Sequence, residues 1–191
     1  MEIGDFYRNI LYISDEDLVQ KLIPHSKRFT VKKGEILQNI GECISSVSFL
    51  EEGLVRGFFL DRKGNEITDC FGIWPGTPAV SCLDLDMPSP ICIETLETST
   101  LISIPVSVLF ELLKDNPNAI AVYNRLLQIS LQVNWESKIT LAQYSARERY
   151  LWFLEKYPGL IDRVTHKHIA SFLGMTPVQL SRVRTGLSKQ T

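Results

Sequence analysis

The feature that most constrains this fold is a stretch of 26 residues, 118–143, that contains neither glycine nor proline. Asn116-Pro117 precedes it, and an asparagine cap followed by proline at the first helical position predicts a helix start. One stripe recurs every seven residues and is apolar except for Asn134: Ile120, Leu127, Asn134 and Leu141. A second apolar stripe consists of Val122, Leu126, Ile129 and Val133. A helix with two apolar faces must bury both. We expect one face to cover the rest of the chain and the other to meet a second copy; the alternative is a helix buried within its own core.

The residues before this helix follow a different period. A short helix is predicted from Ser14 to about Ile23, and another from Pro105 to about Asp115. Between them, β-branched and aromatic runs are separated by glycine-containing turns; the runs are residues 27–31, 47–51, 54–60, 66–71 and 91–104. Strands of this length and spacing are typical of an antiparallel sandwich or a barrel-like roll.

Charge is divided unevenly along the chain. Residues 1–137 hold 11 Lys+Arg and 19 Asp+Glu, whereas residues 138–191 hold 9 and 3, which together give the totals of 20 and 22. An acidic body followed by a basic tail indicates a polyanion as the partner of the tail. Chance segregation of surface charge is the alternative.

Several classes of protein are excluded by the sequence. The composition, 45% apolar and 22% charged, is that of a globular protein, and no apolar run is long enough for a membrane helix. The N-terminus lacks the basic and apolar regions of a secretory signal, so we expect a cytoplasmic protein. The cysteines lie too far apart for a compact metal site, and no nucleophile–base pair is visible; the cysteines are Cys43, Cys70, Cys82 and Cys92. We expect no enzyme, no metal and no cofactor.

The most informative motif runs from Thr165 to Leu187. Thr165 is predicted to cap one helix, Gly174 to form a sharp turn, and Thr176-Pro177 to begin a second helix. The apolar positions of both helices then face one another, as in a helix-turn-helix. A generic helical hairpin is the alternative.

The exposed face of the second helix predicts contacts with DNA. Arg182 can pair with guanine, Gln179 with adenine, and Val178 can meet a thymine methyl group. The predicted phosphate contacts are Lys167, Thr176, Ser181 and Arg184, and Pro177 completes the predicted DNA-binding face.

This order of parts resembles the Crp/Fnr family of bacterial transcription regulators. The matching segments are Val31–Glu35, Glu52–Arg56 and Gly64–Glu66 in the roll, and Ile169-Ala170, Leu173-Gly174 and Leu180–Arg182 in the tail. The resemblance implies an α+β fold with a cyclic-nucleotide-binding-like β-roll (a double-stranded β-helix) in residues 1–115. It further implies a dimerisation helix in 116–143 and a helix-turn-helix domain, without a C-terminal wing, in 144–191. Val178 stands where the best-known members carry a glutamate, so sequence preference should differ from theirs.

The resemblance fails at the phosphate cassette of the cyclic-AMP-binding members. Phe71-Gly72 is followed by Ile73-Trp74-Pro75, and residues 64–113 contain no Lys or Arg. A buried cyclic phosphate would lack a cation, which costs several kcal/mol. We therefore expect a degenerate effector pocket that does not bind cyclic AMP; its candidate residues are Phe71, Gly72, Val80, Ser81 and Cys82.

The expected function is sequence-specific DNA binding by a homodimer formed through residues 117–143, in regulation of transcription. RNA polymerase and an unidentified small-molecule effector are further candidate partners. The alternative is a small-molecule-sensing β-roll protein whose basic tail mediates protein contacts.

Overall fold

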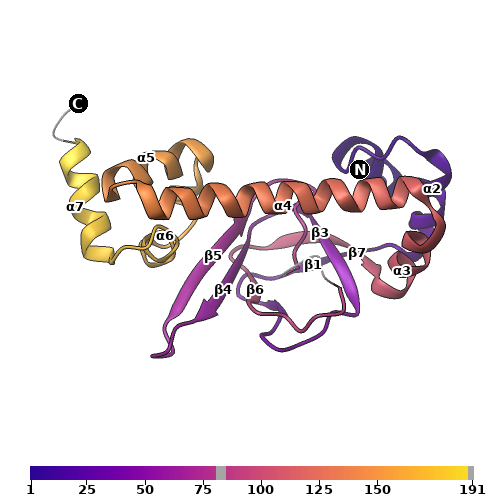
Figure 1. Cartoon of the computed structure of the whole chain (residues 1–191), viewed down its shortest axis with the longest axis horizontal. Helices are drawn as coiled ribbons and strands as arrows, with labels where there is room; N and C mark the ends of the chain where they lie inside the picture. The colour runs from indigo at the N-terminus through magenta and orange to yellow at the C-terminus, as the bar shows by residue number, and fades with distance from the viewer. Residues whose placement is uncertain (81–84, 189–191) are drawn as a thin grey trace. The chain divides into compact units, whose positions relative to one another are not determined.

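The computed structural model describes residues 1–80 and 85–188, and it contains both helices and antiparallel sheets (Figure 1). The predicted α+β class is confirmed. The chain divides into two compact units: the first joins residues 1–57 with 71–128, and the second joins 58–70 with the chain from 129 onward. Among the described residues, no helix is long and apolar enough to cross a membrane.

Two sheets carry the strands of the described residues. The three-stranded sheet has the spatial order β1 (Lys27–Val31), β7 (Ser99–Pro105), β3 (Ser46–Glu52). The four-stranded sheet has the order β2 (Ile36–Gln38), β6 (Cys92–Thr95), β4 (Val55–Leu60), β5 (Glu66–Gly72). Leu101 of β7 is paired with Phe29 on one side and Leu50 on the other, in antiparallel register. Both Leu101 and Leu50 are fully buried, so β7 anchors the core of this sheet.

The predicted strands differ from the observed ones in two places. The run predicted from residue 91 to 104 is divided into β6 and β7, because a turn intervenes where the Ser99 hydroxyl donates to the Glu97 carbonyl. The short strand β2 was not predicted; its register with β6 shifts between Ile36 and Gln38, so it lacks a regular alternation. Three residues without alternation leave no periodic signal.

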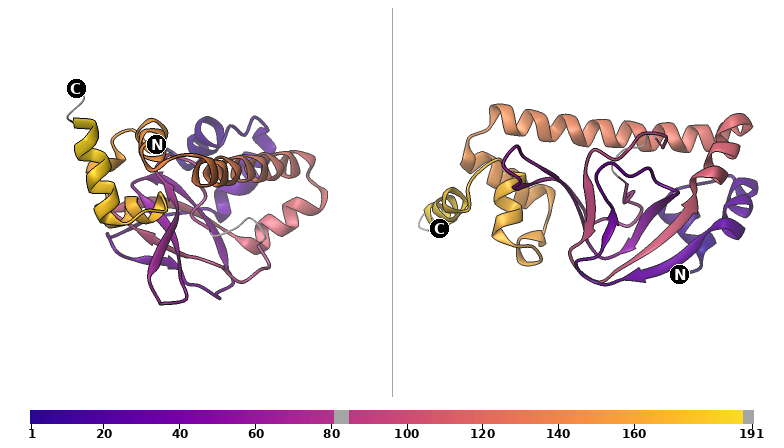
Figure 2. Two further views of the ribbon diagram at one scale, coloured as in Figure 1. Left: turned by 60° about the vertical axis from the view of Figure 1, so that its left-hand side comes forward. Right: turned by 90° about the horizontal axis from the view of Figure 1, so that it is seen from below.

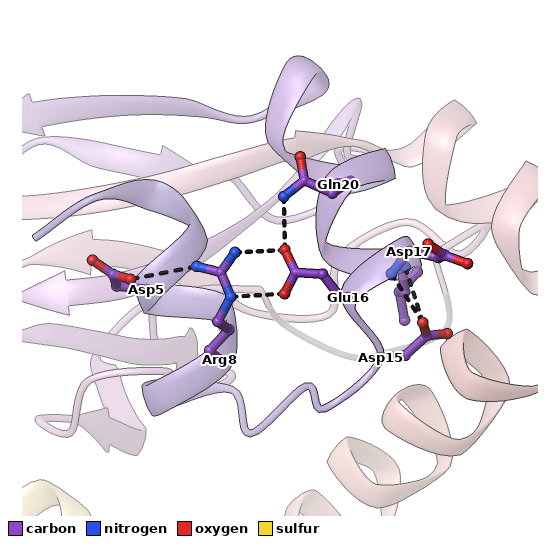
Figure 3. A network of polar contacts seen from close by, with 7 residues as sticks. Asp5, Arg8, Asp15, Glu16, Asp17 and Gln20 are labelled. Carbon is purple, nitrogen blue, oxygen red and sulfur yellow. Dashed lines mark hydrogen bonds and ion pairs between the residues drawn. The ribbon is translucent and has the colours of Figure 1, made fainter.

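The N-terminal segment consists of short helices: α1 (Ile3–Asp5), the π-helix η1 (Phe6–Ile10), α2 (Glu16–Leu22) and η2 (Ile23–His25). The predicted helix start at Ser14 is wrong, since Asp15 is the cap and its carboxylate accepts from the N–H groups of Asp17 and Leu18. Arg8 binds Glu16 through two hydrogen bonds of 2.9 and 2.7 Å, which join η1 to α2 (Figure 3).

Two helices follow β7: α3 (Val106–Asp115) and α4 (Pro117–Gln143). As predicted, Asn116 caps α4, and its Oδ1 accepts from the N–H groups of Asn118 and Ala119 at 3.0 Å each. The 27 residues of α4 span about 40 Å at 1.5 Å per residue, and both units contain part of this helix. Figure 2 shows α3 and the N-terminal helices beside the first turns of α4.

The core of the first unit is formed where these elements meet. Phe6, Tyr7 and Val19 of the N-terminal segment are fully buried and pack with residues of β3 and β7. Val122 and Leu126 of α4 pack against this cluster, so one predicted stripe of the helix does cover the roll.

The second unit contains α5 (Ala146–Lys156), η3 (Leu160–Asp162), α6 (His166–Phe172) and α7 (Pro177–Ser188), gathered at the C-terminal end of α4 (Figure 1). Ser145 and Glu148 form a capping box at the start of α5. Trp152 stacks on Phe172 with ring centroids 6.0 Å apart, and Phe153 and Tyr157 complete this aromatic cluster. The hairpin of residues 58–70 belongs to this unit, because the Thr68 N–H donates to the Ser171 hydroxyl of α6 at 2.8 Å.

Candidate nucleic-acid interface

The turn between α6 and α7 depends on Gly174. Its φ of 61° lies in the left-handed region, which side chains rarely adopt. The N–H of Met175 donates across the turn to the carbonyl of the fully buried Ala170 at 2.9 Å. Arg149 of α5 donates from Nη1 to the Leu173 carbonyl at 2.6 Å, which satisfies a carbonyl left unpaired at the end of α6. The predicted sharp turn at Gly174 is confirmed, but the bond from Arg149 had no signal in the sequence.

The start of α7 is held by a reciprocal pair of hydrogen bonds. The Gln179 N–H donates to the Thr176 hydroxyl at 3.2 Å, and the Thr176 N–H donates to Gln179 Oε1 at 2.8 Å. This is a capping box, and it confirms Thr176 as the predicted cap. It also gives Gln179 a structural role that the sequence interpretation missed, although the spacing of Thr and Gln three residues apart carries the signal.

The faces of α7 are arranged as the apolar spacing predicts. Leu180 is buried in the interior of the second unit, and Val183 is half-buried. Val178 is 60% exposed, and the remaining outward side chains are also exposed; these are Thr176, Pro177, Gln179, Ser181 and Arg182. One turn of helix therefore presents an apolar, an amide and a guanidinium group to solvent together.

Arg184 has a different environment from Arg182. It is half-buried, and its Nη1 contacts a ring nitrogen of His166, the first residue of α6. It also hydrogen bonds Tyr150; burial raises the pKa of Tyr150 while the charge of Arg184 lowers it. Lys167, in contrast, is exposed on α6. Arg184 is thus positioned by α5 and α6, which the sequence alone could not indicate.

The basic residues of the second unit do not all contribute to this surface. Arg149 is bonded to the Leu173 carbonyl, and Lys156 is paired with Glu136. Hydrogen bonds from the Ser145 side chain and from the Ser145 N–H lower the pKa of the Glu148 carboxyl in the capping box. Lys167, Arg182 and Arg184 are therefore the cations that α6 and α7 carry.

Three of the predicted effector residues lie within the described part of the roll. Phe71 and Gly72 are buried in β5, and a Cβ on Gly72 would lie 2.7 Å from Val55 Cγ2. Val80 packs against the core of the first unit. Ser81 and Cys82 lie outside the described residues.

The roll does contain a buried cation that the sequence interpretation overlooked. Arg56 of β4 is 1% exposed, and its Nη1 lies 3.0 Å from Glu94 Oε1 of β6. Arg56 precedes residues 64–113, the segment without Lys or Arg on which that interpretation was based.

Within residues 1–80 and 85–188, no group of three or more histidine, cysteine, aspartate or glutamate side chains could hold a metal ion. Of the described cysteines, Cys43 is exposed, Cys70 half-buried and Cys92 buried, and none of these three forms a disulfide.

Comparison with known proteins places this arrangement in context. No family model matches the chain. It is 24% identical over 182 residues to the regulatory protein HlyX of Actinobacillus pleuropneumoniae, covering 90% of this chain and 75% of that protein. It is also 24% identical over 186 residues to the transcriptional activator protein FnrA of Stutzerimonas stutzeri, covering 92% and 75%.

A solved structure has the same fold. A protein from Eubacterium rectale, described as a transcriptional regulator of the Crp/Fnr family, superposes with a TM-score of 0.74 at 18% identity and covers 96% of this chain and 88% of its own. At this identity the match shows the fold alone. Together with the sequence relatives, it confirms the resemblance on which the expected fold was based.

Proposed function

We propose that this chain, a transcription regulator of the Crp/Fnr family, binds specific duplex DNA as a homodimer, with α7 in the major groove. The observation that carries the proposal is the exposed N-terminal half of α7, opposite the buried Leu180, in a unit built as a helix-turn-helix. Such a regulator acts on the chromosome, in the cytoplasm. RNA polymerase stays a predicted partner on the strength of the resemblance.

The exposed side chains of α7 take the role of base readers. Arg182 can donate two bonds to guanine O6 and N7, and Val178, one turn earlier, can meet a thymine methyl group. Gln179 already accepts from the Thr176 N–H, so pairing with adenine would compete with helix capping. We therefore assign most of the base discrimination to Arg182 and Val178.

The remaining side chains take the role of phosphate contacts. Lys167 at the start of α6 and Ser181 on α7 are exposed, and Arg184 is held between Tyr150 and His166. A guanidinium fixed in this way loses little conformational entropy when it binds a phosphate. Thr176 and Pro177 lie at the N-terminal end of α7, where helix N–H groups favour an anion.

Exposed apolar residues on α4 support the homodimer. Ile120 and Leu127 of the seven-residue stripe are 38% and 37% exposed, although Val122 and Leu126 between them pack on the core. Further exposed apolar residues follow toward the C-terminal end of the helix: Ile129, Leu131, Trp135, Ile139 and Leu141. A helix with this much apolar surface indicates a protein partner, and the seven-residue repeat favours a second copy of the same helix.

The dimer is tested by Leu127→Asp, which places a charge in the middle of the stripe. Analytical ultracentrifugation should show a monomer for this variant and a dimer for the wild type. Gln128→Asp, at the next and exposed position, is the matched control and should remain dimeric. A dimeric Leu127→Asp protein would contradict the assignment.

The buried ion pair supports the expectation that cyclic AMP does not bind. The charge of Arg56 is compensated by Glu94, 3.0 Å away, and a cyclic phosphate approaching this arginine would meet the carboxylate as well. Calorimetry with cyclic AMP should give no saturable heat; micromolar binding would overturn this part of the proposal.

DNA binding is tested with a duplex selected from a randomised pool and a scrambled version of it, by fluorescence anisotropy at several salt concentrations. Arg182→Ala should lose about 1–3 kcal/mol on the selected duplex and less on the scrambled one, because it removes a base contact. Lys167→Ala should weaken both duplexes alike and lower the salt slope by about one counterion.

Lys21→Ala, in α2 of the first unit, removes the same charge far from α6 and α7 in sequence and should leave both affinities unchanged. Equal losses on both duplexes for Arg182→Ala would reduce this residue to a phosphate contact. If no duplex from the pool binds the wild-type protein, DNA binding is refuted. The alternative function, in which the basic tail mediates protein contacts, would then stand.

A further inference from the structure

The core of the first unit contains an apolar cavity of about 70 Å³. Its walls come from the N-terminal segment, the strands β3 and β7, the loop residue Leu85, the helix α3, and the first turns of α4. Representative wall residues are Leu11, Leu18, Phe49, Leu112, Ala119 and Leu126. The described members of the predicted effector pocket, Phe71, Gly72 and Val80, are not among these wall residues.

The walls offer almost no polar group to an occupant. All of the wall side chains are aliphatic or aromatic, and the tyrosines Tyr7 and Tyr123 are the members with a polar atom. The hydroxyl of Tyr7 is hydrogen bonded to the Ser26 hydroxyl, which in turn donates to the Leu22 carbonyl at 2.7 Å. Burial raises the pKa of Tyr7 to about 12, so this group stays uncharged at neutral pH. A water molecule needs two to four polar partners, and a cavity of this kind therefore stays dry.

One wall of the cavity is formed by the N-terminal segment, which we call the lid and which is hydrogen bonded to α4 on its outer side. Leu11, Ile13 and Leu18 of the N-terminal segment form the inner surface of this lid. Its outer edge is attached to α4, because Arg125 donates to the carbonyls of Leu11 and Tyr12, and Asn118 donates to the Asp15 carboxylate at 2.6 Å. The lid turns at Tyr12, whose φ of 50° is left-handed, a strained conformation for a residue other than glycine.

We propose that this cavity is a binding site for a small, uncharged, apolar molecule that enters when the N-terminal lid moves away from α4. The size limits the ligand: an apolar cavity of about 150 Å³ binds benzene or xenon, and this one has about half that volume. The class is therefore a molecule of a few non-hydrogen atoms, such as a dissolved apolar gas or a short hydrocarbon. Ile120 and Leu127 lie on the same turns of α4 as the wall residues, so a bound ligand would also affect the proposed dimer interface. Ligand binding itself does not depend on the proposed DNA-binding function.

The test uses xenon as the probe on the full-length protein. Methyl NMR under increasing xenon pressure should give saturable shifts for Ala119 and Leu126. Ala119→Leu fills the cavity and should abolish saturation at Leu126, whereas Ala121→Leu, the same substitution at an exposed position of α4, should leave it unchanged. If Ala119→Leu does not fold, Leu126→Phe replaces it, with the Ala119 methyl as the reporter.

Two further arms address the size of the cavity and the lid. Benzene should fail to bind the wild type and should bind after Leu126→Ala enlarges the cavity. Arg125→Ala removes the bonds to Leu11 and Tyr12 and should speed xenon exchange without loss of affinity. The proposal is overturned if the Ala119 and Leu126 methyls show no saturable shift, if filling the cavity leaves xenon binding intact, or if loosening the lid leaves exchange unchanged.

Discussion

Replacing Gly174 by alanine should destabilise the second unit more than the same substitution at the other two glycines of its helices and turns, Gly159 and Gly186. Two costs are combined in this substitution. The left-handed backbone conformation, with φ of 61°, costs a side chain roughly 1–2 kcal/mol. The added Cβ would also lie 3.1 Å from Arg149 Nη1 and 3.3 Å from Leu141 Cδ2, so both neighbours must shift.

The shift of Arg149 has an energetic consequence of its own. Its Nη1 donates to the Leu173 carbonyl at 2.6 Å, and a hydrogen bond from a charged donor contributes about 1.5–3 kcal/mol. Partial loss of this bond adds to the backbone strain. We expect the free energy of unfolding to fall by roughly 2–4 kcal/mol in total.

Two other glycines of the same unit separate these costs. Gly159 also has a left-handed φ, 74°, but nothing lies within 4 Å of its added Cβ, so Gly159→Ala should cost only the backbone strain of about 1–2 kcal/mol. Gly186 lies within α7 in open space, and Gly186→Ala should stabilise the helix by roughly 0.5–1 kcal/mol.

The assay is urea unfolding followed by the fluorescence of Trp152, which stacks on Phe172 at the end of α6. Trp74 and Trp135 are both about half exposed and are replaced by phenylalanine in every variant. If Gly174→Ala and Gly159→Ala prove equally costly, the proposed role of Arg149 is refuted. If Gly174→Ala costs no more than Gly186→Ala, the left-handed turn itself is not required.

Three further predictions concern the remaining polar contacts. Glu94→Leu should lower the free energy of unfolding by about 3–5 kcal/mol, because it leaves the buried Arg56 without its carboxylate, and Arg56→Met in the same chain should recover much of the loss in urea unfolding. Thr176→Ala should cost about 1 kcal/mol by removing the cap of α7, measured as faster amide exchange in that helix, whereas Thr176→Ser should not. Bonding to Arg8 lowers the pKa of Glu16 to about 2, so this carboxylate stabilises the fold above its ordinary pKa of 4.5 and loses the effect as the pH falls toward 2. Glu16→Gln should therefore lower the melting temperature at neutral pH, and a difference that persists undiminished at pH 2 would contradict this origin.

Local signals in the sequence predicted the parts of this protein whose energetics are local. Three helix caps lie where they were expected, at Asn116, Thr165 and Thr176. A cap can be predicted locally because its side chain lies within three residues of the N–H groups that it satisfies. The apolar spacing of α7 likewise placed Leu180 inside and Arg182 outside, since the helical period decides which residues share a face.

Contacts between distant residues followed only from the tertiary structure. Arg149 and Leu173 are separated by 24 residues, and Arg56 and Glu94 by 38, so no short pattern relates them. The apolar cavity is the extreme case, because its wall residues are spread along the chain between Tyr7 and Leu126. All of them are aliphatic or aromatic, so nothing in the sequence distinguishes them from ordinary core residues. The apolar pattern of a sequence indicates which side chains are buried. Whether those side chains fill the interior without leaving a cavity depends on how the helices and strands pack in three dimensions.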